Sequence, residues 1–120
     1  MAKVLLYHNP ACSKSRGALE ILEARGEALE IVEYLKAPLS ETDLGALLKR
    51  LDTSPAALVR KDKHFKELGL DPSAYGEGVD PAAVVAILVQ HPRLMERPVA
   101  VVGDRAVIGR PPENVLKLLG

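Results

Sequence analysis

The stretch that decides the fold is Tyr7–Arg16, YHNPACSKSR, which holds Cys12, the one cysteine of the chain. Just before it, Val4–Tyr7 is a short apolar run typical of a buried parallel strand. After it, apolar residues recur at helical spacing until Gly26 offers a C-terminal stop. We therefore predict a strand followed by a helix, with Cys12 at or just before the N-terminus of that helix.

This position favours an ionised thiol. The unpaired N–H groups and the dipole at a helix N-terminus attract an anion, and such a site can lower a thiol pKa from about 8.5 to ~3.5–7.5. The first turn carries Lys14 and Arg16 instead of acidic residues, and a protonated His8 would add to the same field. A thiolate or a bound oxyanion would supply the anion these cations need. A buried structural cysteine beside a solvated basic turn fits the same spacing.

Composition restricts the class of protein. The chain has 120 residues, of which 48% are hydrophobic, so we expect one domain spanning residues 1–120. Its 16 basic and 16 acidic residues balance, which gives no electrostatic reason to expect binding to nucleic acid or to a membrane. Its apolar runs are too short for a signal peptide or a membrane span, and one cysteine cannot form an internal disulfide. We expect a reducing, cytoplasmic setting. Three scattered histidines beside one cysteine predict no metal site.

The remaining pattern predicts an α/β fold with a small mixed sheet, in the order β-α-β, helical insertion, β-β-α. A second strand completes a β-α-β unit, which favours parallel pairing, and the insertion covers about residues 40–90. Ser40 with Asp43 resembles a capping box, and Asp80–Pro81 is a good start for a helix that should be buried on nearly all sides. Gly103–Asp104 predicts a hairpin turn. The predicted strands lie at about 3–7, 28–34, 99–102 and 105–108. The predicted helices lie at about 13–25, 54–60, 62–68 and 82–90, and another begins at Ser40. A last predicted helix points Val115, Leu116, Leu118 and Leu119 inward.

The cysteine segment resembles the active-site segment of the glutathione/glutaredoxin-coupled arsenate reductase family, whose fold is thioredoxin-like. Further segments similar to that family follow in its order and cover nearly the whole chain: Leu58–Lys61, Gln90–Pro92, Arg97–Val99 and Gly109–Pro111. The resemblance implies that Cys12 is the nucleophile that reduces arsenate to arsenite. It also implies that oxyanion-binding arginines stand at Arg60, Arg97 and Arg110.

Spacing alone would make each of these arginines a solvated surface residue: Arg60 at a helix end, Arg97 at the start of a strand and Arg110 in a turn. The chemistry gives a reason to gather them, because an anionic thiolate must approach anionic arsenate, and guanidinium groups neutralise and orient an oxyanion. The resemblance also implies that Arg97–Pro98 is a cis peptide next to Cys12. We include Pro98 with His8, Asn9 and Ser15 as supporting residues.

The lone thiol also predicts what completes the reaction. Attack on arsenate would give a covalent Cys12–arsenic adduct, and without a second cysteine an external thiol must resolve it. The resemblance implies glutathione as co-substrate, followed by glutaredoxin, with no bound cofactor. Ser15 stands where a Cys-X-X-Cys motif would have its second thiol. Its hydroxyl could hydrogen-bond the thiolate or could simply support the start of the helix.

Two other functions fit parts of the pattern. One is a non-enzymatic redox regulator of the same fold that binds RNA polymerase, although Ser15 argues against the Cys-X-X-Cys switch common in such proteins. The other is a thiol oxidoreductase of this fold without arsenate activity, against which the three arginines speak. A phosphatase-like Cys-X5-Arg loop would need arginine at position 18, where Ala18 stands.

Overall fold

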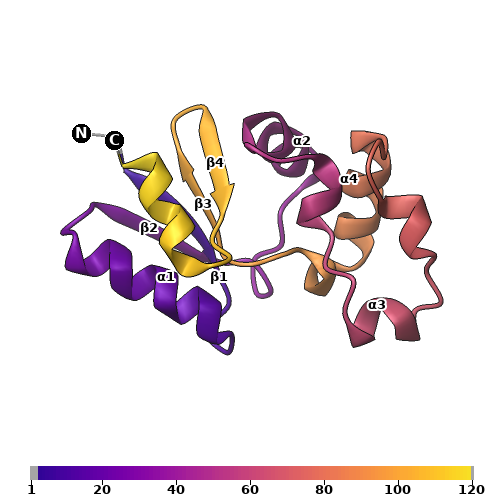
Figure 1. Cartoon of the computed structure of the whole chain (residues 1–120), viewed down its shortest axis with the longest axis horizontal. Coiled ribbons are helices and arrows are strands. Elements are labelled where there is room, and N and C mark those ends of the chain that lie inside the picture. The colour runs from indigo at the N-terminus through magenta and orange to yellow at the C-terminus, as the bar shows by residue number, and fades with distance from the viewer. Residues whose placement is uncertain (1–2, 120) are drawn as a thin grey trace. The chain divides into compact units, whose positions relative to one another are not determined.

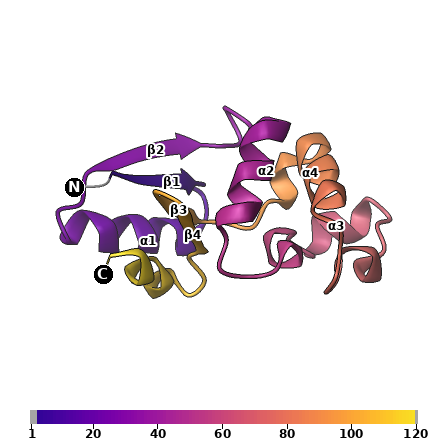
Figure 2. The same cartoon turned by 90° about the horizontal axis from the view of Figure 1, so that it is seen from above.

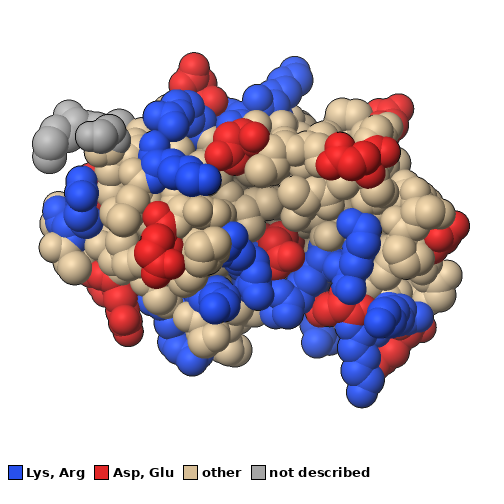
Figure 3. Space-filling model, viewed as in Figure 1, with Lys and Arg blue, Asp and Glu red and all other residues tan. Residues whose placement is uncertain are grey.

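The computed structural model describes residues 3–119 of the protein, which divides into two compact units. One, here called the sheet unit, combines Met1–Ala37 with Arg97–Gly120, and the other, the helical unit, is Pro38–Glu96. The helical unit contains the insertion that was predicted at about 40–90. Charged side chains of both signs are spread over the face of the molecule shown in Figure 3.

The sheet unit contains four strands in the order β2-β1-β3-β4 (Figure 1). They are β1 (Val4–His8), β2 (Leu29–Glu33), β3 (Val99–Val102) and β4 (Arg105–Ile108), and the helix α1 (Ser13–Ala24) connects the first two. The β1–β2 pair is parallel, whereas β1–β3 and β3–β4 are antiparallel. Gly103 turns the β3–β4 hairpin with φ 58°, a conformation that glycine adopts without steric cost. The predicted α/β fold with a small mixed sheet is confirmed.

One apolar core joins this sheet to α1 and to the 3₁₀-helix η4 (Pro112–Leu118), which cover the same face of the sheet (Figure 2). Across the strands, Leu6 pairs with Ala100, and Ala100 pairs with Val107. The buried members are Val4, Leu6, Ala18, Leu22, Ala100, Val107, Val115 and Leu118. The prediction that Leu116 faces inward was wrong, because it is 39% exposed: η4 is a 3₁₀-helix, whose three-residue turn buries Val115 and Leu118 on one side.

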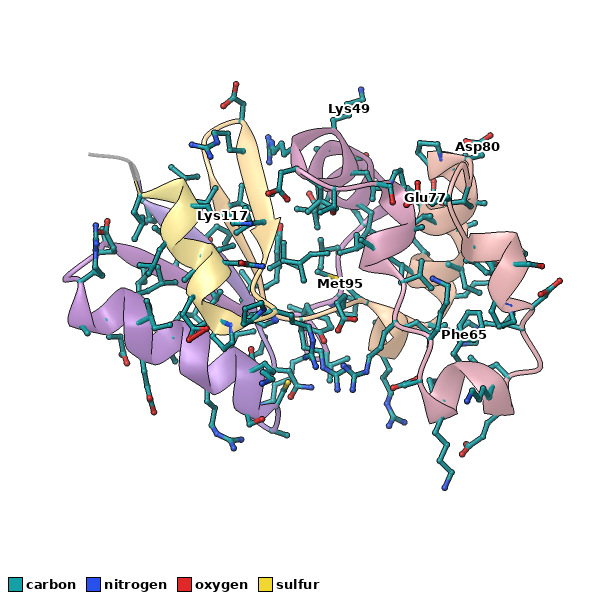
Figure 4. The ribbon with its side chains drawn as sticks, in the orientation of Figure 1. Lys49, Phe65, Glu77, Asp80, Met95 and Lys117 are labelled. Carbon is teal, nitrogen blue, oxygen red and sulfur yellow. The ribbon has the colours of Figure 1, made fainter. Side chains whose placement is uncertain are left out.

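The helical unit is built from short helices, several of which begin with a proline. Its helices are α2 (Glu41–Arg50), η1 (Pro55–Leu58), α3 (Lys63–Glu67), η2 (Pro72–Tyr75), α4 (Pro81–Gln90) and η3 (Pro92–Leu94). The capping box at the start of α2 and the Asp80 cap with Pro81 at the start of α4 are both confirmed. The turn η2 lies in the predicted loop, where Asp71 accepts the Ser73 N–H. Phe65 points from α3 into this unit and meets Tyr75 edge to face (Figure 4).

The helix α4 is less buried than its apolar sequence predicted. Val84, Ile87 and Leu88 are buried, whereas Val89 is 39% exposed. A helix whose sequence is apolar on all sides does not reveal which side packs against other elements. In α4 the buried residues form one stripe along the helix. Within residues 3–119, no helix is both long and apolar enough to cross a membrane.

Gly109 lies where the chain has no room for a side chain. A Cβ built there would be 2.8 Å from Pro98 Cγ and 3.3 Å from Val115 Cγ1. We therefore expect Gly109→Ala to lower the free energy of unfolding in urea by about 1–3 kcal/mol, since overpacking forces neighbours out of place. Gly45→Ala is the matched control: it lies in α2 with no atom within 4 Å of the new Cβ, so alanine should stabilise by about 0.5–1 kcal/mol. Equal effects at both positions would refute the close packing at Gly109.

Candidate active site

Cys12 is the N-cap residue of α1, and its side chain makes no capping hydrogen bond. The loop before it is folded on Asn9: the side-chain oxygen of Asn9 accepts the Ala11 N–H at 3.0 Å, and its carbonyl accepts the Cys12 N–H at 3.0 Å. Cys12 is a free, partly buried thiol. Its predicted place at the start of the helix is confirmed, and the first turn of α1 carries no acidic residue that would oppose an anion there.

The pKa of Cys12 is lowered to about 7. Burial is the strongest influence and raises the pKa, because it disfavours the charged thiolate. The backbone N–H of Ser15, a hydrogen bond from the Arg97 side chain, the backbone N–H of Lys14 and the charge of Arg97 act in the opposite direction and together outweigh burial. A large fraction of Cys12 is therefore thiolate at neutral pH, the form that acts as a nucleophile.

Two arginines of the sheet unit approach this sulfur. Arg97 precedes β3 and donates a hydrogen bond to Cys12. Arg110 follows β4, and its Nη1 lies 3.9 Å from Cys12 Sγ and donates to the Arg97 carbonyl at 3.1 Å. Both arginines are partly buried. The fold thus brings together Cys12, Arg97 and Arg110, which are far apart in sequence, and gathers positive charge beside the thiol.

The turn that carries Arg110 is fixed by neighbours within the same unit. Asn114 donates from Nδ2 to the Arg110 carbonyl at 3.1 Å, and the Gly109 N–H donates to the Pro98 carbonyl at 2.8 Å. The predicted cis peptide at Arg97–Pro98 is present, and Arg110–Pro111 is a second one, which was not predicted. Asn114 was also missed, because an asparagine after two prolines gives no sequence signal of what it contacts.

His8 and Ser15 form a buried polar pair under the cysteine loop. His8 Nδ1 and Ser15 Oγ are 2.7 Å apart, and Ser15 Oγ also accepts the Asn9 N–H at 2.9 Å. Ser15 lies on the buried stripe of α1, so its hydroxyl contacts these two groups, and its backbone N–H is one of the groups that lower the pKa of Cys12. Of the two roles considered for this hydroxyl, the geometry favours support of the helix start.

The field expected from a protonated His8 needs correction. Burial is the main influence and lowers the pKa of His8; the charge of Glu33 raises it, and that of Arg16 lowers it further. Because burial lowers the pKa of His8, it favours the neutral imidazole, which adds no full positive charge near Cys12. Arg97, which sequence reasoning assigned only to oxyanion binding, supplies side-chain charge that favours the thiolate.

Arg60 belongs to the helical unit, where two carboxylates hold its side chain. Its Nε donates to Asp62 at 2.9 Å, and its Nη1 donates to Glu96 at 3.1 Å. Burial raises the pKa of Asp62, but the hydrogen bonds from Arg60 and the Phe65 N–H and the charge of Arg60 outweigh it and hold that pKa below its ordinary value. Asp62 and Glu96 were not among the predicted site residues. Asp62 directly follows the motif Leu58–Lys61, and Glu96 directly precedes the motif Arg97–Val99. An acidic residue next to an arginine-containing motif is the sequence signal that could have identified them.

The Cys12 pKa leads to a direct prediction. Because the folded-state pKa lies near 7, the rate of Cys12 alkylation by iodoacetamide should rise with a midpoint near pH 7 and level off above about pH 8. Arg97→Ala removes both its hydrogen bond and its charge, so the midpoint should move upward. A wild-type midpoint at or above 8.5 would contradict an activated thiol.

Comparisons with known proteins point to one family. Residues 7–118 match the sequence model of the ArsC family. The chain is 40% identical over 121 residues to a protein named arsenate reductase from Neisseria meningitidis, covering 99% of this chain and 100% of that one. It is 42% identical over 120 residues to the protein named Uncharacterized protein YfgD of Escherichia coli strain K12, covering 98% of each. A solved structure described as arsenate reductase from Vibrio cholerae matches with a TM-score of 0.83 at 36% identity, over 97% of each chain. The thioredoxin-like fold that the resemblance implied is confirmed.

Proposed function

Because this chain belongs to the ArsC family, we propose that it reduces arsenate to arsenite, with Cys12 as the nucleophile. The observation that carries the proposal is a thiol with a pKa of about 7 at a helix N-terminus, with Arg110 Nη1 3.9 Å from its sulfur. The names of the relatives from Neisseria meningitidis and Vibrio cholerae support arsenate as the substrate.

The arginines would allow the Cys12 thiolate and arsenate, which are both anions, to approach each other. Arsenate carries one to two negative charges near neutral pH, so a thiolate that approaches it is repelled. Guanidinium groups from Arg97 and Arg110 offset this repulsion, orient the oxyanion and stabilise the charge that develops in the transition state. Arg60 is proposed as a third oxyanion-binding residue on the basis of the family motif Leu58–Lys61. His8, Asn9, Ser15 and Pro98 support the cysteine loop.

The thiolate sulfur attacks arsenic and forms an S–As bond, and an arsenate oxygen leaves as water. The overall reaction needs two electrons: arsenate and two thiols give arsenite, one disulfide and water. The one thiol of this chain cannot supply both electrons, so an external thiol is required. We propose glutathione as this co-substrate and glutaredoxin as the protein that completes the reduction, with no bound cofactor, in a reducing cytoplasm where such thiols are abundant.

The test is arsenite formation by the purified protein supplied with arsenate, glutathione, glutaredoxin and a reductant. We expect continuous turnover that falls to the background when glutathione is left out and falls strongly when glutaredoxin is left out. Turnover that continues with thioredoxin alone would keep arsenate reduction and refute the proposed donor. No arsenite from folded protein whose Cys12 still alkylates near pH 7 would refute arsenate as the substrate.

A further inference from the structure

Arg60 lies in a short antiparallel pairing of two segments of the helical unit. Val59 pairs with Met95, which is labelled in Figure 4, in an isolated β-bridge. Next to this bridge the Arg60 N–H donates to the Leu94 carbonyl at 2.7 Å, and the Glu96 N–H donates to the opposite segment at 2.8 Å. The backbone at both ends of the Arg60–Glu96 ion pair is therefore fixed by hydrogen bonds.

Two carboxylates also fix the guanidinium group itself. Asp62 receives the Nε hydrogen bond and Glu96 receives one from Nη1, and the three side chains are only 19–31% exposed. Asp62 is held in turn, because its second oxygen accepts the Phe65 N–H and caps α3. Partial burial makes such charge-assisted bonds stronger than those of a surface pair.

This arrangement determines which donors Arg60 can offer. A guanidinium group has five N–H donors, of which the one on Nε and one on Nη1 are taken by the carboxylates. The second N–H of Nη1 and the two N–H groups of Nη2 remain for a ligand. Arg60 would thus contact an oxyanion through its Nη groups, because the Nε donor needed for a side-on two-pronged contact is already taken.

We propose that Asp62 and Glu96 are positioning residues, which hold the guanidinium group of Arg60 so that its remaining Nη donors are available to the oxyanion. The inference rests on the proposed function. In a purely structural role, in which the three side chains only tie two segments together, the loss of activity in each variant would follow a matching loss in the free energy of unfolding in urea.

The test is a double-mutant comparison with arsenate as substrate. Asp62→Asn keeps an oxygen that can cap α3, and Glu96→Gln keeps the shape of the side chain, so each removes mainly the charge. In the wild-type background each should lower kcat/KM by about 10-fold, since a misplaced binding group is costly to the reaction. In an Arg60→Ala background each should change it by less than about 2-fold, because the residue they position is gone. Glu67→Gln is the matched control: its carboxylate pairs only weakly with Lys63, at 4.0 Å, and it should leave turnover unchanged in both backgrounds.

A second readout does not depend on turnover. Arsenate bound beside Cys12 should protect it from alkylation, and Asp62→Asn and Glu96→Gln should each raise the arsenate concentration needed for half protection by about 10-fold. Equal losses with and without Arg60, no loss in either variant, or losses that only match a fall in the free energy of unfolding in urea would overturn the positioning role. A wild-type protein that neither turns over arsenate nor is protected by it would overturn the proposed function, and the positioning role with it. That failure is recognised from the wild type alone.

Discussion

Cys12→Ser is expected to abolish arsenate reduction, with a loss on the order of 10⁴-fold or more. A serine hydroxyl is not ionised near neutral pH and cannot be reduced away from arsenic by a second thiol, so both steps of the proposed reaction stop. The measurement is the initial rate of arsenite formation under saturating glutathione and glutaredoxin.

The same variant contains its own folding control. Cys12 is the N-cap of α1 and makes no side-chain capping bond, whereas serine is one of the preferred N-cap residues. The urea midpoint of Cys12→Ser should therefore equal or exceed that of the wild type. Substantial turnover in a variant that is folded by this criterion would show that another group carries out the reaction.

Arg110→Ala should lower kcat/KM by about 10²–10³-fold, the usual cost of removing one preorganised donor from a developing anion. Its Nη1 lies 3.9 Å from the Cys12 sulfur, so its charge also favours the thiolate, beside the hydrogen bond and charge of Arg97. The Cys12 alkylation midpoint in Arg110→Ala should therefore rise, and turnover should stay low even when it is measured above that midpoint, where Cys12 is ionised. The pair of measurements separates oxyanion binding from thiol activation.

Two comparisons make this prediction specific. Arg110→Lys keeps the charge but loses the planar guanidinium, so it should recover only part of the rate. Arg25→Ala removes an exposed arginine at the far end of α1 and should leave turnover unchanged. If Arg110→Ala keeps a near-normal rate, Arg110 is a solvated surface residue, as its position in a turn would suggest without a structure.

Local signals in the sequence were enough to predict most elements of the sheet unit. The apolar run before Cys12, the spacing after it and the Gly103–Asp104 turn are all features of neighbouring residues, and each gave the correct element. The failures in the fold came where a local pattern cannot identify a packing partner. The apolar sequence of α4 did not reveal that Val89 would be exposed, and Leu116 differs from Val115 in exposure although both are apolar.

The candidate site also combines features that local sequence predicts with features that depend on residues distant in the chain. The position of Cys12 at a helix N-terminus is a local property and was predicted from its neighbours. The helix N-terminus was predicted to lower its pKa, and the backbone N–H groups of Ser15 and Lys14 do so. The added contribution expected from His8 was wrong, because burial, which lowers the pKa of His8, cannot be read from the segment itself. Arg97 reaches Cys12 from a distant part of the chain, and only the fold brings the two together. The pairing of Arg60 with Glu96 depends in the same way on a bridge between Val59 and Met95.

The most direct test of the central claim is whether arsenic bonds to Cys12. The wild-type protein would be mixed with arsenate and glutathione in the absence of glutaredoxin, quenched, and examined by intact-mass and peptide mass spectrometry. The account predicts an arsenic-containing adduct on the peptide that holds Cys12, absent from Cys12→Ser and depleted when glutaredoxin is added. Arsenite formation at the full rate with no arsenic on Cys12 at any quench time would contradict it.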